Sequence, residues 1–118
     1  MVPVEPKISV EYRGKATIVT FTEEKILEDK NIQSIDSSIM AVLDQSEHIF
    51  MVLDFTNVRF LSSAVLGLLI RLSKRIYEKD GRLMLCKIDP KIYEIFKITR
   101  LTKVFDIYDD VDSAIETI

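Results

Sequence analysis

The order of strand-like and helix-like segments limits the folds open to this chain more than any other feature of its sequence. Two short segments rich in β-forming residues come first, at residues 8–12 and 16–21, and Gly14 lies in the loop between them. This arrangement predicts an antiparallel β-hairpin. Helical and strand patterns then alternate to the end of the chain, which implies right-handed crossovers and parallel pairing. We therefore predict an α/β fold: a mixed, mostly parallel sheet with an N-terminal antiparallel hairpin and about four helices.

The individual elements follow from the spacing of apolar residues. An amphipathic helix is predicted over residues 31–44, and the continuous apolar run 49–53 suits a strand in the middle of the sheet, buried on both faces. A second helix extends from Ser62 or Ser63 to Lys79 and stops at Gly81, which we expect in the left-handed cap position. The remaining predicted elements are a strand over 82–86, a helix that begins at Asp89-Pro90 with Ile92, Ile95, Phe96 and Thr99 inward, a strand over 104–108, and a terminal helix after Asp109-Asp110.

Composition and charge exclude several functional classes. The 118 residues suit a single domain, for which we expect a short flexible lead at residues 1–7. With 16 Lys and Arg against 19 Asp and Glu the net charge is −3, and no basic block offers a nucleic-acid backbone the clustered cations it requires. The apolar runs are far shorter than the roughly 20 residues that cross a bilayer. Since no signal peptide is recognisable either, we expect a cytoplasmic protein without membrane contact.

Metal, cofactor and enzyme chemistry have no recognisable basis in the sequence. Cys86 is the only cysteine and His48 the only histidine, so the chain cannot assemble a Cys/His zinc cage. It contains no Gly-rich phosphate loop and no nucleophile paired with a base. We therefore expect a protein that is not an enzyme and that holds no cofactor or metal.

The connector between the central strand and the second helix is the best candidate for a functional site. Loops beyond the carboxyl ends of parallel strands carry the functional groups of open α/β sheets. Asp54 ends the strand, and Ser62 and Ser63 stand at the start of the helix. A phosphate on an exposed Ser63 would meet free backbone amides and the positive end of the helix dipole, so it would alter binding rather than folding. Gly67, one turn further on, would let the helix approach the sheet closely.

Residues 52–67 resemble the signature of the STAS domain, and specifically that of bacterial anti-sigma factor antagonists, and the resemblance covers nearly the whole chain. The resemblance is carried by Val52-Leu-Asp54-Phe-Thr56-Asn57-Val58 and by Phe60-Leu-Ser-Ser63-Ala64-Val-Leu66-Gly67. It implies a STAS-like fold and a partner-switching protein. In such a switch the unmodified antagonist binds an anti-sigma factor serine kinase and so frees a sigma factor. The kinase phosphorylates the antagonist's serine to end that capture, and a cognate phosphatase reverses the modification.

Carried over residue by residue, the resemblance puts the phosphoacceptor at Ser63, with Ser62 as second choice, and aligns Asp54 with the acid that ends the preceding strand. Ser62 stands where the family usually has Asp, and Val65 stands where it usually has Gly. We expect the protein to be a monomer or weak dimer. For the contact with its partner we expect exposed apolar residues, such as Leu61 and Val65. The expected partner-binding residues are Asp54, Thr56, Asn57, Leu61, Ser62, Ser63 and Val65.

A purely structural explanation competes with each of these roles. Ser62 and Ser63 are good helix caps, and Asp54 suits a strand end where it accepts hydrogen bonds from loop amides. Cys86 is expected to behave as a small buried apolar residue. Four further side chains are expected in the core: Met51, Met84, Phe60 and Phe96.

Two other functions stay open. A receiver-type phospho-aspartate domain is also an α/β sheet with an acid after an apolar strand, as at Asp54. It requires an acidic pair after its first parallel strand to hold Mg²⁺, whereas Glu23-Glu24 follow the second strand of a hairpin here. The other alternative keeps the STAS fold and makes the domain a scaffold or transporter-accessory module that is never phosphorylated.

Overall fold

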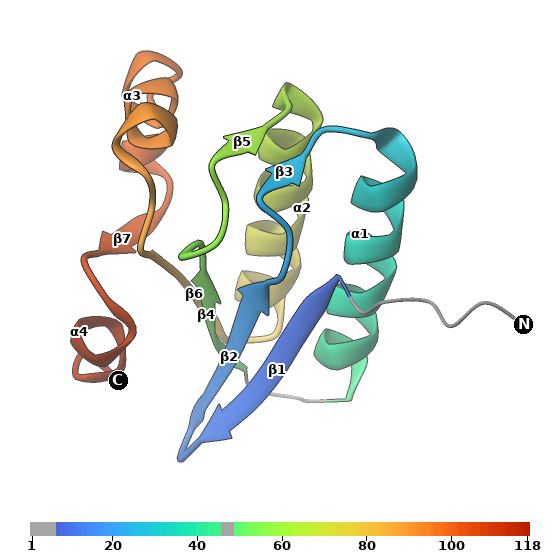
Figure 1. Cartoon of the computed structure of the whole chain (residues 1–118). Helices are drawn as coiled ribbons and strands as arrows, with labels where there is room; N and C mark the ends of the chain where they lie inside the picture. Colours follow the sequence, from blue (N-terminus) through green and yellow to red (C-terminus); the bar gives the residue numbers. More distant parts are fainter. Residues whose placement is uncertain (1–6, 46–48) are drawn as a thin grey trace, which may run out of the picture.

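Figure 1 shows the computed structural model, in which residues 7–45 and 49–118 are described. Residues 1–6 of the predicted lead, and also His48, lie outside the described part. Lys7 belongs to the fold rather than to a flexible lead, because its carbonyl accepts a hydrogen bond from the Thr22 amide at 3.1 Å and its ammonium pairs with Glu23. No helix in the described ranges is long and apolar enough to span a membrane.

A five-stranded mixed sheet forms the centre of the molecule, as predicted. Its strands are β1 (Ile8–Arg13), β2 (Ala16–Phe21), β4 (Phe50–Asp54), β6 (Arg82–Cys86) and β7 (Asp106–Tyr108), in the order β1-β2-β4-β6-β7. β1 and β2 pair antiparallel, with Ile8 opposite Phe21, and the other neighbours are parallel. β4 lies in the middle of the sheet with no exposed surface on its central residues, which confirms the predicted central strand.

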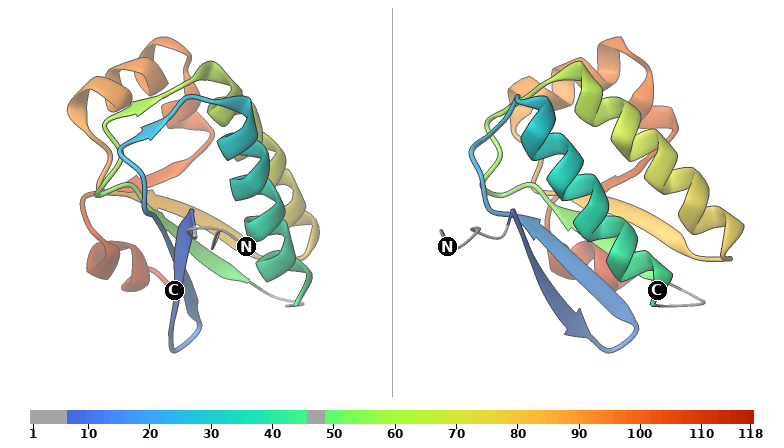
Figure 2. Two further views of the ribbon diagram at one scale, coloured as in Figure 1. Left: turned by 45° about the vertical axis from the view of Figure 1, so that its right-hand side comes forward. Right: turned by 90° about the vertical axis from the view of Figure 1, so that its right-hand side faces the viewer.

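Two long helices cover one face of this sheet (Figure 2). α1 (Asp29–Asp44) begins two residues before the predicted start, and α2 (Ser63–Glu78) begins and ends close to its predicted bounds. Together with the facing strands they enclose the larger core. Each fully buried Leu or Ile side chain contributes about 1.5–3 kcal/mol. The inner stripe of α2 recurs at helical spacing and is buried throughout: Val65, Leu68, Leu69, Leu72 and Ile76.

α4 (Val111–Ile115) covers the opposite face of the sheet (Figure 2). It begins after Asp110, whose carboxylate accepts a hydrogen bond from the Ser113 amide at 2.7 Å. This N-cap confirms the predicted acidic helix start. Ala114 packs in a second, smaller core with Ile18, Val52, Met84 and Cys86.

α3 (Pro90–Ile98) and the 3₁₀-helix η1 (Leu101–Lys103) lie beyond the carboxyl ends of the parallel strands (Figure 1). α3 begins as predicted: Asp89 accepts a hydrogen bond from the Lys91 amide at 2.9 Å, and Pro90 takes the first helical position. A proline loses nothing there, because the first amide of a helix has no intrahelical partner.

The inward face of α3 is narrower than predicted. Ile92 and Phe96 are buried, but Ile95 and Thr99 are exposed, so the prediction is wrong at these two positions. α3 packs at the end of the sheet rather than over its face, and therefore buries only a narrow stripe. The last strand is also shorter than predicted, since η1 and a turn precede it and leave Val104 half exposed.

A second, two-stranded sheet is missing from the prediction. β3 (Lys25–Ile26) and β5 (Phe60–Leu61) pair in parallel, with Lys25 opposite Phe60 and Ile26 opposite Leu61. Two residues per strand are too few to show the alternation by which strands are recognised. This small ladder lies directly before α2 in the chain, so it affects the candidate site.

Two predictions about glycines are wrong. Gly81 does not take the left-handed position, which Asp80 adopts with a φ of 58°. Gly81 is required by close packing instead, because a Cβ there would lie 2.3 Å from the Ile49 carbonyl oxygen. A Cβ on Gly67 would meet only the Arg71 side chain, at 3.7 Å. Gly67 therefore does not mark a close approach of α2 to the sheet.

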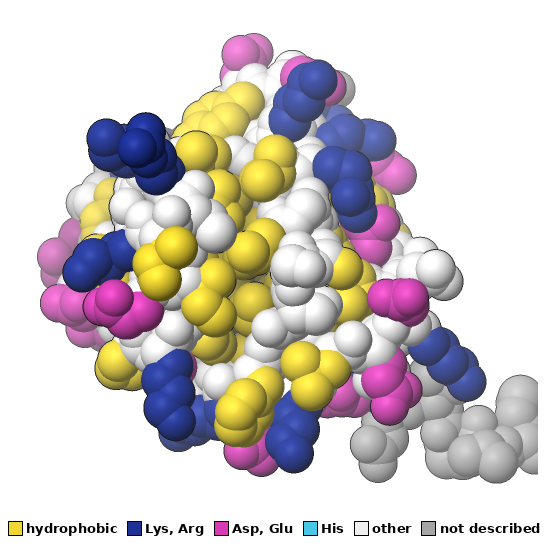
Figure 3. Space-filling view, turned by 90° about the horizontal axis from the view of Figure 1, so that it is seen from above, with side chains coloured by type: hydrophobic (Ala, Val, Ile, Leu, Met, Phe, Trp, Pro, Cys, Tyr) yellow, Lys and Arg dark blue, Asp and Glu magenta, His cyan; other side chains and the backbone are white. Residues whose placement is uncertain are grey.

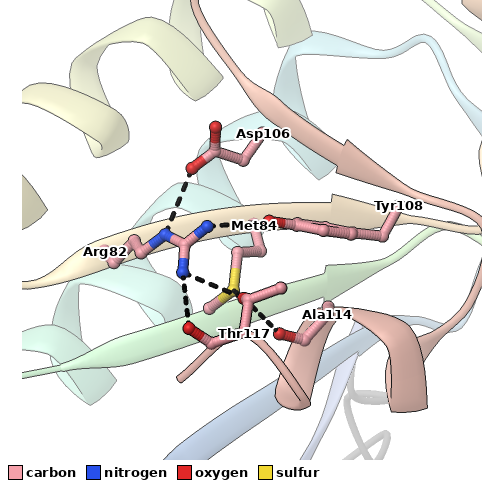
Figure 4. A network of polar contacts seen from close by, with 6 residues as sticks. All are labelled: Arg82, Met84, Asp106, Tyr108, Ala114 and Thr117. Carbon is pink, nitrogen blue, oxygen red and sulfur yellow. Dashed lines mark hydrogen bonds and ion pairs between the residues drawn. The ribbon is translucent and has the colours of Figure 1, made fainter.

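Arg82 joins β6 to β7 and to the last residues of the chain (Figure 4). Its Nε donates to the Asp106 carboxylate at 3.2 Å, and its terminal nitrogens donate to the Tyr108 hydroxyl at 2.7 Å and the Thr117 hydroxyl at 2.9 Å. The Thr117 hydroxyl donates in turn to the Ala114 carbonyl at 2.7 Å. The network thus fastens the short edge strand and the end of α4 to the body of the sheet.

Candidate functional site

Asp54, at the carboxyl end of β4, organises the turn that follows the strand. Its Oδ1 accepts hydrogen bonds from the Thr56 amide, at 2.9 Å, and from the Thr56 hydroxyl. A carboxylate that bonds the backbone two residues on is typical of an Asx-turn. The structural explanation for Asp54 is therefore confirmed, and its side chain is already engaged within the loop.

Buried side chains hold the β4–β5 connector against the sheet. Phe55 and Val58 have no exposed surface, and the rings of Phe55 and Phe21 lie 4.9 Å apart between centroids. Thr56 and Asn57 are exposed, and the Asn57 side-chain amide donates to the Phe21 carbonyl at 3.0 Å. The connector thus exposes its polar side chains while its buried Phe55 and Val58 hold its backbone in place.

The β3–β5 ladder positions the start of α2. The Glu24 carbonyl accepts hydrogen bonds from the amides of Arg59, at 2.8 Å, and Phe60, at 3.1 Å. The Ile26 carbonyl accepts one from the Ser62 amide at 3.0 Å. These bonds fix the chain up to the residue that precedes the helix, so Ser63 is held in place by segments far apart in the sequence.

Ser63 is the first residue of α2, and it is exposed, as predicted. Ser62 takes the N-cap position with an extended backbone, but its hydroxyl caps no amide. Its Oγ is buried and has no hydrogen-bond partner among the described residues. The predicted capping role of Ser62 is therefore wrong, and the first turn of α2 has neither a side-chain cap nor an acidic residue.

The apolar side chains around Ser63 differ from those predicted. Val65 is 2% exposed and packs in the larger core, so the expectation that it is exposed is wrong. Phe60, predicted in the core, is 46% exposed, and Leu27 is 49% exposed. Leu61 is half-buried. We call Leu27, Phe60 and Ser63 the Ser63 surface.

Leu27 and Phe60 reach the surface because of the β3–β5 ladder. Side chains alternate along a strand, so Ile26 points into the core while its two neighbours are exposed. The Lys25 ammonium lies 5.6 Å from the centroid of the Phe60 ring. Figure 3 looks onto this end of the molecule and shows apolar side chains bordered by both basic and acidic ones. A lone Leu27 among charged residues belongs to no periodic pattern, which is why sequence reasoning missed it.

A cavity of about 560 Å³ lies between the β4–β5 connector, the start of α3 and the end of β7. Arg59 and Asp89 form an ion pair of 3.1 Å between the connector and α3. The lining includes Thr56, Lys87, Ile88, Tyr93 and Ile107. The cavity occupies the place where open α/β sheets usually bind ligands, beyond the carboxyl ends of the strands.

Cys86, at the end of β6, is fully buried as predicted. Its burial, with the nearby carboxylates of Asp54 and Asp110, raises the pKa of the thiol to about 12. The thiol therefore stays protonated at neutral pH, whereas nucleophilic attack and metal binding need the thiolate. Within residues 7–45 and 49–118, no three or more His, Cys, Asp or Glu side chains are grouped so that they could hold a metal ion.

Comparison with known proteins identifies the family. The STAS domain family model matches residues 7–114. This chain belongs to the STAS domain family. The match confirms the resemblance to this family over nearly the whole chain.

Two curated relatives of this STAS protein are named as antagonists of anti-sigma factors. BtrV of Bordetella bronchiseptica, which bears that name provisionally, is 25% identical over 89 residues, or 75% of this chain and 76% of BtrV. The anti-sigma F factor antagonist of Paenibacillus polymyxa is 32% identical over 71 residues. That second match spans 60% of this chain and 59% of the relative.

Solved structures share the fold. A STAS domain protein from Planctomyces limnophilus has a TM-score of 0.85 at 24% identity, over 93% of this chain and 96% of that one. SpoIIAA in its unphosphorylated and phosphorylated forms gives TM-scores of 0.68 and 0.70 at 17% identity, over 93% of this chain and 96% and 97% of theirs. The murine anion transporter Slc26a9 gives 0.76 at 15% identity, over 91% of this chain but 18% of the transporter. The predicted α/β STAS-like fold, with its hairpin and four helices, is thereby confirmed.

Proposed function

We propose that this STAS protein is an anti-sigma factor antagonist that binds a serine kinase anti-sigma factor and is released from it by phosphorylation of Ser63. The observation that carries the proposal is the exposed hydroxyl of Ser63 at the first position of α2. The names of its two relatives support the general role. The existence of SpoIIAA, a protein of the same fold, in a phosphorylated form supports the mode of control.

A phosphate on Ser63 is expected to change the surface and leave the fold intact. The side chain already faces solvent, so the added group needs no space in the core. The first turn of α2 contains no acidic residue that would repel the phosphate, and the helix dipole favours a negative charge at this end. A phosphoserine adds about −1.5 to −2 charges. Such a charge beside apolar Leu27 and Phe60 would have to be desolvated when a partner covers the Ser63 surface, which opposes binding.

Leu27 and Phe60 are proposed to supply the apolar part of the contact. Interfaces are centred on buried apolar and aromatic side chains ringed by polar groups. Phe60 is about half exposed and lies beside Lys25. The other proposed members of the interface are Asp54, Thr56, Asn57, Leu61 and Ser62. Val65 is buried, so it would act only by packing the start of α2 against the core.

The two alternative functions find less support. In a receiver domain the phospho-accepting aspartate must be free to react, whereas Asp54 is engaged by Thr56 and no metal-holding group occurs in the described part of the chain. A scaffold or transporter-accessory role is favoured only by the likeness to Slc26a9, which is a likeness of fold. We infer that the protein is a binding protein rather than an enzyme, with the kinase and a cognate phosphatase as partners.

Phosphopeptide mapping tests the proposal. The tagged protein is incubated with ATP in an extract of its own cells, recovered and digested with trypsin. Cleavage after Arg59 and Arg71 yields one peptide that contains both serines, Phe60 to Arg71. Fragmentation in the mass spectrometer is expected to place the phosphate on Ser63.

Two variants make the mapping decisive. Ser63→Ala should abolish the modification, and Ser62→Ala should retain it, because the Ser62 hydroxyl is buried. Phosphate on Ser62 alone, an acid-labile phosphate on Asp54, or no phosphate in cells whose other serine kinase substrates are labelled would each contradict the proposal.

A further inference from the structure

The exposed surface of α3 and η1 is apolar and basic in a protein that is acidic as a whole. Ile98 is 79% exposed, the largest exposed fraction among the described large apolar side chains, and Ile95 and Val104 are 40% and 50% exposed. Residues 87–104 contain five Lys or Arg and two Asp or Glu, a net charge of +3 against −3 for the chain. The remaining residues therefore sum to −6. We call Ile95, Ile98, Val104 and the cations around them the α3 face.

Three cations of the α3 face have no ion-pair partner in the described part of the molecule. Lys97 is paired with Glu94 at 3.4 Å, whereas no ion pair involves Lys91, Arg100 or Lys103. An exposed apolar side chain beside unpaired cations fits a partner that presents acids around an apolar residue.

The C-terminal residues that follow η1 have this chemistry. Residues 106–118 contain five acids and no Lys or Arg. Glu116 is exposed and has no ion-pair partner among the described residues, and Asp112 keeps 84% of its side chain exposed although it contacts Arg13 at 3.3 Å. The apolar Ile118 is 39% exposed beside them. We call Asp112, Glu116 and Ile118 the α4 face.

We propose that the α3 face of one copy of this protein docks on the α4 face of a second copy, so that copies assemble head to tail. Figure 1 shows α3 above and α4 below β7 on one side of the molecule, so the two faces are separate surfaces that two different copies can cover. A contact between two unlike faces is heterologous and extends into chains or rings. Two α3 faces would set cation against cation, so a symmetric dimer through this surface is disfavoured. The contact lies apart from Ser63 in the sequence and does not depend on the proposed function.

Charge complementarity makes the assembly sensitive to salt. Exposed charges are screened within about 8–10 Å at physiological ionic strength. An anionic membrane is a poorer occupant, because the residues outside 87–104 carry a net charge of −6, which an anionic surface repels. We expect a weak assembly that grows with protein concentration and at low salt.

Sedimentation velocity of the full chain tests this proposal. The weight-average sedimentation coefficient of the wild type should rise with concentration at low salt and fall back to the monomer value at high salt. Ile98→Glu should abolish the rise, and the matched control Ile70→Glu should keep it, since Ile70 is an exposed isoleucine of α2. Circular dichroism melting verifies that each variant is folded.

A charge-reversal experiment identifies the occupant. The triple variant Lys91→Glu, Arg100→Glu, Lys103→Glu and the double variant Asp112→Lys, Glu116→Lys should each remain monomeric alone and assemble when mixed. The single control Lys74→Glu, which changes an exposed lysine of α2, should behave as the wild type. Three results would overturn the proposal: a wild type that stays monomeric at low salt, assembly that survives reversal of either face, and variants that fail to assemble when mixed. Co-sedimentation with phosphatidylglycerol vesicles, if it required Ile98, would point to a membrane and also overturn it.

Discussion

At the scale of single residues, the two adjacent serines show how little chemical type determines role. As residue types Ser62 and Ser63 are equivalent, since each can cap a helix or accept a phosphate, although the family resemblance favours Ser63 as the phosphoacceptor. In the structure the Ser62 hydroxyl is buried without a partner, whereas Ser63 faces solvent. The difference arises from the Ile26 carbonyl, which holds the Ser62 amide at 3.0 Å and thereby fixes how the chain enters α2.

Ser62→Ala is expected to leave the free energy of unfolding unchanged or to raise it slightly. A hydroxyl that is buried without a hydrogen bond keeps only its desolvation cost, roughly 1–3 kcal/mol. Asp89→Ala serves as the control, because Asp89 does cap α3 and the loss of a working cap costs about 0.5–2 kcal/mol. Urea denaturation of both variants measures the difference. A loss at Ser62 as large as that at Asp89 would show that the Ser62 hydroxyl is a cap after all.

The Cys86 thiol is expected to react with a disulfide reagent such as DTNB only after the protein unfolds. Its pKa is raised to about 12 in the fold, so at pH 8 almost no thiolate is present, and the side chain has no exposed surface. Absorbance at pH 8 should show slow labelling of the native protein and rapid labelling in concentrated urea. Equal rates in the two conditions would contradict the described burial.

At the scale of elements, the predicted helices and strands agree best with the structure where the sequence pattern is long. The hairpin and α2 extend over many residues, and the structure has both close to the predicted bounds. β3 and β5 have two residues each and are visible only once their partners are known. The role of a glycine is likewise not visible in a local pattern. Whether a side chain could replace the hydrogen of Gly67 or Gly81 depends on the atoms that lie next to it in space.

The two glycines should therefore respond in opposite ways to alanine. Gly67→Ala is expected to raise the free energy of unfolding by up to about 1 kcal/mol, because alanine favours the helix and a Cβ meets nothing closer than 3.7 Å. Gly81→Ala is expected to lower it by about 1–3 kcal/mol or more, because its Cβ would lie 2.3 Å from the Ile49 carbonyl oxygen. Denaturant curves of the pair measure both changes. A stable Gly81→Ala protein would contradict the close contact between the end of α2 and the start of β4.

The N-cap of α4 should weaken in acid. Hydrogen bonds from the Ser113 amide and hydroxyl lower the pKa of Asp110. A lowered pKa in the folded state means that the stabilisation is complete above the pKa of the unfolded chain and is lost as the pH falls through the folded value. The NMR shift of the Ser113 amide should follow this titration, with a midpoint below the ordinary value for aspartate. Asp110→Asn should remove the pH dependence, and its persistence would assign the titration to another group.

At the scale of the whole molecule, the fold was accessible from the sequence, but the surface around the proposed site was not. Alternating patterns predict the layers, and the connector after Asp54 predicts where the chemistry lies. The surface required knowing that β3 pairs with β5, which exposes Leu27 and Phe60 while α2 buries Val65. Such pairing links residues more than 30 positions apart, and no local pattern encodes it.

The Arg82 network shows another global property that the sequence does not reveal. One guanidinium joins β6, β7 and the last residues, all of which lie far from the Ser63 surface in the sequence (Figure 4). The contacts of Arg82 therefore stabilise a part of the fold that does not include the proposed phosphorylation site. Under the proposed function, we expect a phosphate at Ser63 to change what the molecule binds and to leave its fold unchanged.

The central claim is that phosphorylation of Ser63 weakens binding to the proposed kinase, and the affinity measured with and without the phosphate tests it most directly. The kinase recovered with the wild-type protein is titrated calorimetrically with unmodified protein and with protein that carries phosphoserine at position 63. Ser37→Asp, at an exposed serine of α1, controls for added charge alone. We predict that phosphoserine at position 63 weakens binding at least about tenfold, equivalent to about 1.4 kcal/mol. The affinity of the Ser37→Asp variant and the melting temperature of the phosphorylated protein should both stay close to the wild-type values. Equal affinities of the modified and unmodified proteins would contradict the account.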